Sequence, residues 1–325
     1  MSAKEMSETI KFTLDGQPAE AKAGETIWDV AKRNGTTIPH LCHRPQKGYR
    51  PDANCRACMV EIKGERVLAP SCRRQPTEGM EVTTDNERAT KARRMVLELL
   101  LSDQPERREA HDPDSLFWYW ADKAGIADSR FEARAACPAP DRSHSAMAVN
   151  LDACIQCNLC VRACREVQVN DVIGMAGRGH KSKIVFDMDD PMGDSTCVAC
   201  GECVQACPTG ALMPATMVDE KQVHVGKPDR TVDSLCPYCG VGCQATFHVK
   251  DNKIVYVEGK DGYANENRLC VKGRFGFDYV DHPHRLTKPL IRKDGIEKHG
   301  EMELDPSNPL THFREASWDE ALDFA

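Results

Sequence analysis

Four groups of cysteines carry the chemistry that this sequence offers. Two of them form an internal repeat, "CIQCNLCVRAC" at 154–164 and "CVACGECVQACP" at 197–208, matching at an offset of 43 residues. The spacing C-x2-C-x2-C-x3-C is typical of bacterial ferredoxins with two [4Fe–4S] clusters, in which the fourth cysteine of each run binds the other cluster. The repeat therefore predicts two such clusters. The predicted ligands are Cys154, Cys157, Cys160 and Cys207 for one cluster, and Cys197, Cys200, Cys203 and Cys164 for the other.

A pair of structural zinc sites is the alternative interpretation of the repeat. Such sites usually combine two separated C-x2-C pairs, an arrangement that neither run has. Arg165 follows Cys164 where the ferredoxin pattern has a proline, and we expect the fold to tolerate this departure.

A further group lies closer to the N-terminus, with the spacing C-x12-C-x2-C-x13-C. Its members are Cys42, Cys55, Cys58 and Cys72. The group follows an expected hairpin and helix, where plant-type ferredoxins carry a [2Fe–2S] cluster, although its first gap is longer than theirs. One C-x2-C pair with two distant cysteines also suits a four-thiolate zinc site, so zinc is a real rival at this position. Beside a ferredoxin repeat, we favour a [2Fe–2S] cluster.

The last group begins with "CPYCGVGC" and ends on a distant cysteine 26 residues later. It comprises Cys236, Cys239, Cys243 and Cys270, which we predict to hold another [4Fe–4S] cluster. The small residues 240–242 would let the backbone approach the cluster and donate N–H groups to its sulfurs. Lys272 follows Cys270 by two positions, which in an extended chain places both side chains on one face. Cys137 is left over, and we expect it to be unliganded.

The elements before residue 105 are expected to build a small β-grasp module and a connecting helix. Residues 9–14 alternate like a half-buried strand, Asp15-Gly16 is a hairpin turn, and residues 24–35 suit a helix that Gly35 ends. A closing strand is expected within 78–85. Residues 86–104 suit an amphipathic helix. The expected buried positions are Ile27, Val30 and Ala31 in the first helix, and Ala92, Met95, Val96, Leu99 and Leu100 in the second.

The rest of the chain alternates short strands with the cysteine motifs. The aromatic run "LFWYW" at 116–120 is expected to fill a core. The insert between the repeats suits two strands around a Gly-rich turn, residues 245–249 and 253–259 suit another strand pair, and residues 317–325 suit a helix.

Composition narrows the classes of partner. The formal charge is −7, which argues against nucleic acid or an anionic membrane as the main partner. No apolar run approaches the roughly 20 residues of a membrane span, and the N-terminus lacks a signal core. We therefore expect a cytoplasmic protein with neither nucleic-acid nor membrane partners. Reducing conditions there also disfavour a disulfide framework.

In their order along the chain, namely the N-terminal group, the repeat and the last group followed by Lys272, the cysteine motifs resemble the N-terminal part of the α subunit of cytoplasmic NAD-dependent formate dehydrogenases. The resemblance covers essentially the whole chain. It implies an α+β, multi-module iron–sulfur fold, in which a β-grasp [2Fe–2S] domain and a two-[4Fe–4S] ferredoxin-like domain precede a [4Fe–4S] domain that opens a molybdopterin oxidoreductase fold. The expected domains are 1–84 for the β-grasp, 85–150 for the linker helix and a degenerate His-cluster region, 151–228 for the double-cluster domain, 229–290 for the last cluster and 291–325 for the start of a truncated pterin-binding domain.

The resemblance also implies the reaction and the partners. Formate would be oxidised at a molybdenum or tungsten bis-molybdopterin guanine dinucleotide centre held beyond Ala325, and flavin- and NAD-binding iron–sulfur subunits would receive the electrons. This portion would carry one [2Fe–2S] and three [4Fe–4S] clusters between them. In the family, a lysine at the position of Lys272 lies between the last cluster and the pterin, so Lys272 would serve as an electron relay and pterin contact.

The first half is also similar to the iron–sulfur subunits of respiratory NADH dehydrogenase and of iron hydrogenases. Those proteins carry a further cluster on His-x3-Cys-x2-Cys-x5-Cys. Aligning that pattern on His111 places Ser115, Trp118 and Ala124 at the cysteine positions, which favours formate dehydrogenase and leaves His111 as a surface or packing residue. Alternatives that stay open are another molybdopterin oxidoreductase such as a nitrate reductase, an NADH dehydrogenase or hydrogenase subunit, and a stand-alone electron carrier.

Overall fold

The computed structural model describes residues 9–325 except 135, 221–223, 284, 299–304 and 306–307. The chain forms two compact units, Met1–Phe275 and Gly276–Ala325. The start of the expected 1–84 domain and parts of the expected 291–325 domain therefore lie outside the described residues.

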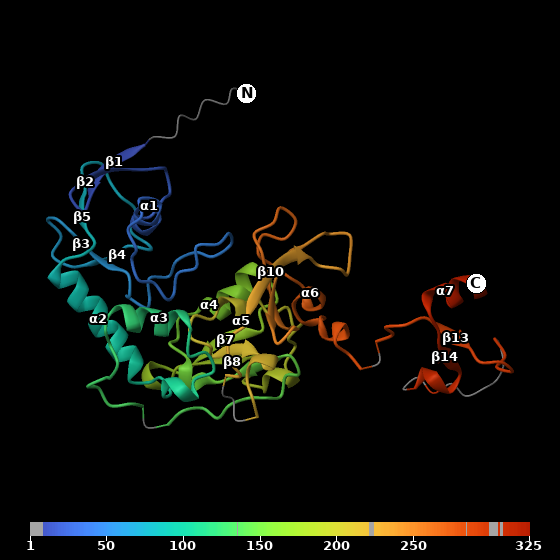
Figure 1. Ribbon diagram of the computed structural model, residues 1–325. Helices are drawn as coiled ribbons and strands as arrows, with labels where there is room; N and C mark the ends of the chain where they lie inside the picture. The colour runs from blue at the N-terminus through green and yellow to red at the C-terminus, as the bar shows by residue number, and fades with distance from the viewer. Residues whose placement is uncertain (1–8, 135, 221–223, 284, 299–304, 306–307) are drawn as a thin grey trace. The chain divides into compact units, whose positions relative to one another are not determined.

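The first unit begins with a five-stranded sheet in the order β2-β1-β5-β3-β4, in which β1 and β5 run parallel (Figure 1). Asp15 and Gly16 adopt positive φ angles of 50° and 78°, so the expected hairpin turn is present. The expected first helix is present as α1, and the Thr26 side chain caps its N-terminus by accepting from the N–H of Asp29. The elements are β1 (Ile10–Leu14), β2 (Gln17–Ala21), α1 (Ile27–Arg33), β3 (Met59–Ile62), β4 (Ala69–Pro70) and β5 (Glu81–Thr83).

Helices α2 (Glu87–Leu101) and α3 (Leu116–Lys123) follow and contact each other. The expected inward face of α2 is wrong in most positions, although the expected Leu100 packs partly buried against a core cluster. The side chains that the structure buries there are Ala89, Arg93, Leu97 and Leu101, while Leu99 is 47% exposed. Arg93 stands in the middle of this stripe and donates to the Thr90 hydroxyl at 3.2 Å. Because this buried position carries a charged residue, a search for apolar periodicity does not detect the buried face of α2.

Helix α3 contains the aromatic run, whose expected role in a core is observed. Phe117, Trp118 and Trp120 are buried, although Tyr119 on the opposite side is 46% exposed. The core cluster that contains these aromatic residues also includes Leu41, which precedes Cys42 of the N-terminal cysteine group, and Leu97 of α2. The run therefore packs the connecting helices against the N-terminal module.

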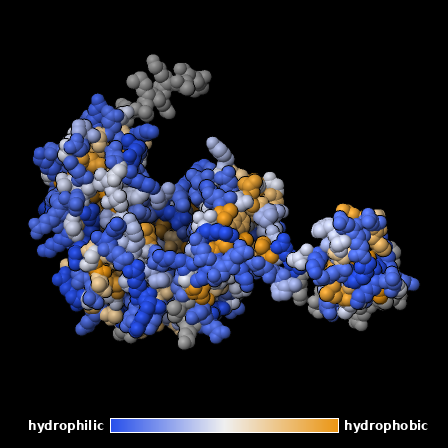
Figure 2. Space-filling view, viewed as in Figure 1, coloured by the Kyte–Doolittle hydropathy of each residue, from blue (hydrophilic) through white to orange (hydrophobic). Residues whose placement is uncertain are grey.

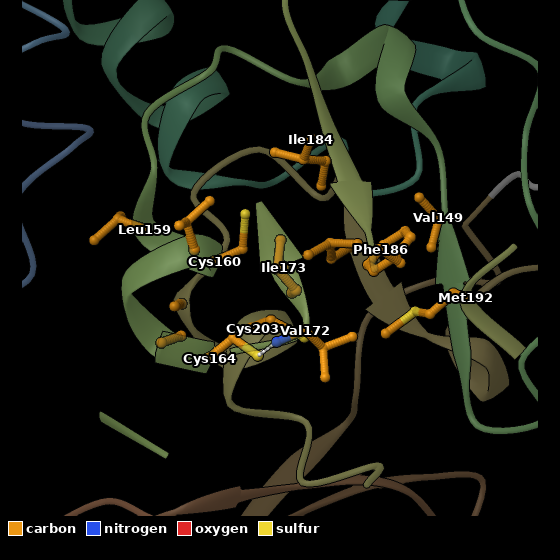
Figure 3. Close-up of a cluster of buried hydrophobic side chains, with 14 of the residues drawn as sticks. Val149, Leu159, Cys160, Cys164, Val172, Ile173, Ile184, Phe186, Met192 and Cys203 are labelled. Atoms are coloured by element: carbon orange, nitrogen blue, oxygen red, sulfur yellow. Dashed lines mark hydrogen bonds between the residues drawn. The ribbon is translucent and has the colours of Figure 1, made fainter. Parts of the chain in front are cut away.

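The double-cluster part is built from two small strand pairs and short helices. The expected pair around the Gly-rich turn is present as antiparallel β7 (Ile173–Ala176) and β8 (Lys183–Phe186). A second antiparallel pair joins β6 (Met147–Val149) to β9 (Leu212–Pro214). The helices are α4 (Leu159–Arg162), which continues into a π-helical turn (Ala163–Val167), and α5 (Glu202–Ala206). Their cysteines lie among aliphatic and aromatic side chains in one core (Figure 3).

The last part of the first unit is a three-stranded antiparallel sheet followed by a short helix. Strands β11 (Gln244–Lys250) and β12 (Lys253–Gly259) are the pair that the sequence predicts, and β10 (Arg230–Leu235) adds a strand that it does not. Every residue of β10 is exposed, so its sequence has no need of the alternation of apolar and polar residues by which a half-buried strand is predicted. Helix α6 (Val271–Phe275) ends the unit.

The second unit is small. Strands β13 (Leu290–Arg292) and β14 (Phe313–Glu315) pair antiparallel, and the expected C-terminal helix is present as α7 (Trp318–Phe324).

Hydrophilic side chains cover much of the visible face of the molecule (Figure 2). No helix among the described residues is long and apolar enough to cross a membrane.

Candidate metal centres

The two halves of the cysteine repeat have the same backbone conformation. Gln156 and Asn158 in the first run, and Ala199 and Gly201 in the second, all have positive φ angles, between 54° and 68°. In each run the N–H two residues after the first cysteine donates to that cysteine's sulfur at 3.4 Å. A left-handed residue costs energy unless it is glycine, and three of these four are not. The shared strain therefore marks two loops shaped to turn several sulfurs inward.

The predicted exchange of the fourth cysteine is consistent with how the thiols influence one another. Burial and then the charge of Cys207 raise the pKa of Cys157 well above its ordinary value. Burial raises the pKa of Cys203 in the same way, and the charges of Cys200, Cys197 and Cys164 follow as further causes. Each run thus has the final cysteine of the other run as an electrostatic neighbour.

Cys164 lies on the π-helical turn after α4, and its sulfur accepts from the Val172 N–H at 3.3 Å (Figure 3). The Asn170 amide lies 3.8 Å from the sulfur of Cys200. N–H groups that point at thiolates stabilise the charged form that binds iron, and they raise cluster potentials. These contacts fit the donor set of an iron–sulfur cluster.

The N-terminal cysteines form a compact group. Hydrogen bonds from Cys55 and then Cys72 lower the pKa of the Cys42 thiol, and a hydrogen bond from Cys72 lowers that of Cys58. The Cys42 N–H also donates to the Cys55 sulfur at 3.4 Å, and the Cys55 N–H donates to the Cys42 sulfur at 3.5 Å. Cys42, Cys58 and Cys72 are buried. Four free thiols in mutual contact could hold a two-iron cluster.

The last group is more open. Cys239 and Cys270 are exposed, and Cys236 and Cys243 are partly exposed. Burial first, and then the charges of the other three thiols, raise the pKa of Cys243. The chain leading to Cys270 is held by Asn265, whose side-chain amide donates to the carbonyl of Gln244 at 2.9 Å and to that of Arg268 at 3.0 Å.

One expectation for this group is corrected by the structure, and the close approach of residues 240–242 to a cluster stays a prediction. Residues 271–275 form helix α6 rather than an extended segment, so Cys270 and Lys272 do not share a face by the alternation rule. The Lys272 side chain is exposed. A β-carbon at Gly240 would meet nothing within 4 Å, whereas one at Gly273 would lie 3.3 Å from the Cys236 sulfur. Gly273 therefore admits a close approach of the Cys236 sulfur, and Gly242 adopts a positive φ of 70° in the turn.

Two remaining candidates, Cys137 and His111, have environments of other kinds. Cys137 is exposed and forms no disulfide. His111 is fully buried and its Nδ1 lies 3.0 Å from the Gly210 carbonyl, so of the two expected roles packing is the observed one. Within the described part of the chain, no three Cys, His, Asp or Glu side chains are grouped to hold a single metal ion. A cubane cluster requires less convergence because each thiolate binds a separate corner.

Three buried charged residues connect different cysteine groups and were not predicted from the sequence, namely Arg162, Glu202 and Arg274. Arg162 donates to the carbonyl of Cys42 at 2.9 Å and to that of Cys157 at 3.4 Å. Arg274 donates to the Cys200 carbonyl at 3.2 Å and pairs with Glu202 at 3.2 Å. Arg162 and Glu202 lie inside cysteine motifs and Arg274 follows Cys270 by four positions, but charge alone gives no sign of burial.

The fold and these thiol groups define the chain as an iron–sulfur protein with several cluster-binding domains. Three family models agree with this class. Residues 7–87 match the 2Fe-2S iron-sulfur cluster binding domain, 153–211 match the 4Fe-4S dicluster domain, and 229–282 match the molybdopterin oxidoreductase Fe4S4 domain.

Relatives narrow the class further. A subunit of the NADH-quinone oxidoreductase of Rhizobium meliloti is 32% identical over 97% of this chain and 35% of its own length. A protein of Staphylococcus haemolyticus, named as a putative formate dehydrogenase, is 27% identical over 98% of this chain and 34% of its own length. A crystal structure of an NAD⁺-reducing [NiFe]-hydrogenase matches with a TM-score of 0.59 and 29% identity, over 63% of this chain and 87% of that one.

The chain spans about a third of the length of the curated relatives that it matches. It is accordingly grouped with the iron–sulfur electron-transfer subunits of molybdopterin oxidoreductase-like complexes. The relatives thus include an NADH-quinone oxidoreductase subunit as well as a protein named as a putative formate dehydrogenase.

Proposed function

We propose that this chain is the electron-transfer portion of an NAD-dependent formate dehydrogenase. It would conduct electrons from formate oxidation at a molybdenum or tungsten bis-pterin centre to a flavin partner that reduces NAD⁺, and the reverse direction would serve CO₂ reduction. The observation that carries the proposal is the order of the three domain matches together with four complete sets of thiols. A relative named as a putative formate dehydrogenase aligns over 98% of the chain and supports the same proposal.

The proposed ligands are the four sets predicted from the sequence. One [2Fe–2S] cluster belongs to Cys42, Cys55, Cys58 and Cys72. The three [4Fe–4S] clusters belong to Cys154, Cys157, Cys160 and Cys207, to Cys197, Cys200, Cys203 and Cys164, and to Cys236, Cys239, Cys243 and Cys270. Such clusters supply one-electron transfer, which links a two-electron metal centre to a flavin. The chain's own residues orient the thiolates, donate N–H groups to them and exclude water from the buried sets.

Metal analysis tests these assignments directly. The purified chain should bind about 14 iron atoms with matching sulfide, given one two-iron and three four-iron clusters. Low-temperature EPR of the reduced protein should show four clusters. Stoichiometric zinc in place of two of the irons would contradict the assignment of the N-terminal set.

The proposed function itself is tested in the full-length protein with its partner subunits. Formate should reduce the clusters, and Cys157→Ser should remove one [4Fe–4S] signal and most NAD⁺ reduction while formate still reduces the metal centre. NAD⁺ reduction at the wild-type rate without that cluster would contradict a linear path.

A second candidate is the iron–sulfur subunit of an NADH-quinone oxidoreductase, which the relative from Rhizobium meliloti favours at 32% identity. Reduction of the clusters by NADH but not by formate, with intact molybdenum or tungsten content, would select this candidate. In either case we expect flavin- and NAD-binding partner subunits and a cytoplasmic location.

A further inference from the structure

Glu202 is a buried carboxylate inside a cluster-binding loop. It lies between Cys200 and Cys203, at the start of α5, and is 1% exposed. At the equivalent position of the repeat, 43 residues earlier, stands the buried Leu159. The repeat therefore shows that the loop forms equally with an apolar residue there. A buried acid that the loop does not need requires another explanation.

Two polar partners hold this carboxylate. The Tyr49 hydroxyl donates to its Oε1 at 2.8 Å, and the Arg274 guanidinium donates to its Oε2 at 3.2 Å. Arg274 is itself 3% exposed, so the pair is fully removed from solvent. Such a pair gains little net stability over apolar side chains, whereas removing one partner leaves an uncompensated charge.

The three members come from three different domain matches. Tyr49 belongs to the N-terminal domain, between Cys42 and Cys55, and Glu202 belongs to the double-cluster domain. Arg274 belongs to the last domain, and its backbone N–H donates to the Cys270 carbonyl at 3.0 Å. Its side chain also donates to the Cys200 carbonyl at 3.2 Å. One hydrogen-bonded chain thus joins the proposed ligand loops of three clusters.

The charges also lie within electrostatic reach of the thiols. The Arg274 Nε lies 3.2 Å from the Cys200 carbonyl oxygen, and Glu202 is one residue from Cys203 and two residues from Cys200 in the chain. Reduction adds a negative charge to a cluster. A buried carboxylate beside the cluster opposes that charge and a buried guanidinium favours it, and both effects are strong where water does not screen them.

We propose that Glu202 and Arg274 are positioning residues that set the reduction potential of the cluster on Cys164, Cys197, Cys200 and Cys203. Glu202 holds this potential down and Arg274 holds it up, while their contacts with Tyr49 and the Cys200 carbonyl lock the three domains in register. The inference rests on the ligand sets of the proposed function.

The test is an EPR-monitored redox titration of the full-length protein with its partner subunits, after iron content has been measured. Glu202→Gln should favour the reduced cluster at least tenfold, about 59 mV for one electron. Arg274→Gln should disfavour it by a similar factor, and Arg274→Lys, which keeps the charge, should stay within threefold of wild type. Opposite shifts are the signature, because a purely structural role would not change sign with the charge removed.

A matched control lies near the same cluster. Glu166 is two residues from Cys164, but it is exposed and pairs with the exposed Arg50. Glu166→Gln should shift the equilibrium less than threefold because solvent screens the pair. If Glu202→Gln loses iron, Glu202→Leu, which copies Leu159 of the repeat, replaces it in the comparison with Arg274→Gln.

Shifts in the same direction, or shifts below threefold in both charge-removing variants, would overturn the inference. A wild-type protein without this cluster's iron and EPR signal would instead overturn the ligand assignment on which the inference rests.

Discussion

The N-terminal and the last thiol groups resemble each other in sequence and differ in burial. Each combines closely spaced cysteines with distant ones, two in the N-terminal group and one in the last group. In the N-terminal group, Cys42 and Cys72 are completely buried, whereas Cys239 and Cys270 of the last group are exposed. Spacing is the basis of the predicted ligand sets, whereas the neighbouring elements decide how much water reaches the thiols.

The neighbours explain the contrast. Leu41, Ala57 and Leu97 lie in one core cluster beside the N-terminal group, so the connecting helix α2 covers it. The last group lies between a strand whose residues are all exposed and a helix of five residues. Few apolar side chains surround it within the described residues of its own domain.

The largest expected effect is on stability next to the enclosed group. Leu41 is fully buried, so Leu41→Ala should lower the free energy of unfolding by about 2–5 kcal/mol. Val241 beside the open group is 58% exposed, and Val241→Ala should change it by less than about 0.5 kcal/mol. Urea unfolding of both variants measures the difference, and equal losses would break the contrast.

Cluster lability should follow the same order. In the purified chain, an iron chelator should remove the last cluster at least thirtyfold faster than the N-terminal cluster, a difference of about 2 kcal/mol in barrier. The reason is the exposure of Cys239 and Cys270 to solvent. EPR signals followed over time measure both rates. Loss of the N-terminal signal first would show that burial does not govern cluster loss here.

Lys272 tests whether the open face is functional. In the full-length protein with unchanged metal, pterin and iron content, Lys272→Ala should lower formate–NAD⁺ turnover at least tenfold, about 1.4 kcal/mol of barrier. A cation between cluster and pterin would stabilise the transferred electron and hydrogen-bond the pterin.

Two controls accompany this variant. NADH-driven dye reduction at the flavin subunit should stay normal, and Lys253→Ala, another exposed lysine in the same domain, should leave turnover unchanged. Unchanged turnover in Lys272→Ala would make Lys272 an ordinary solvated lysine.

The smallest expected effect concerns helix α2, which covers the buried N-terminal thiol group. The Asn86 side chain caps α2 by accepting from the Ala89 N–H at 2.8 Å. Asn86→Ala should cost about 1 kcal/mol of unfolding free energy, because that N–H loses its partner. Lys91→Ala on the exposed face of α2 is the control and should change stability by less than about 0.5 kcal/mol. A similar loss in both variants would assign the effect to the helix rather than to its cap.

Local patterns were enough to predict about half of the helices and strands of the first unit. The hairpin at Asp15-Gly16, helix α1 and the β7–β8 pair all follow from turn residues and apolar alternation. The buried stripe of α2 was missed because Arg93 interrupts it, and β10 was missed because every one of its residues is exposed. Both failures arise where tertiary contacts, rather than side-chain polarity, decide the environment of a residue.

The sequence by itself determined the class of chemistry, because cysteine spacing limits which thiols can reach one cluster. It also indicated the order of the domains and the candidate ligands. Only the tertiary structure decided that Gly273 admits the Cys236 sulfur, that Lys272 lies on helix α6, and that Tyr49, Glu202 and Arg274 meet. These three residues lie up to 225 positions apart in the chain. Their contact depends on how the domains pack, and no local pattern of charge or hydrophobicity contains that information.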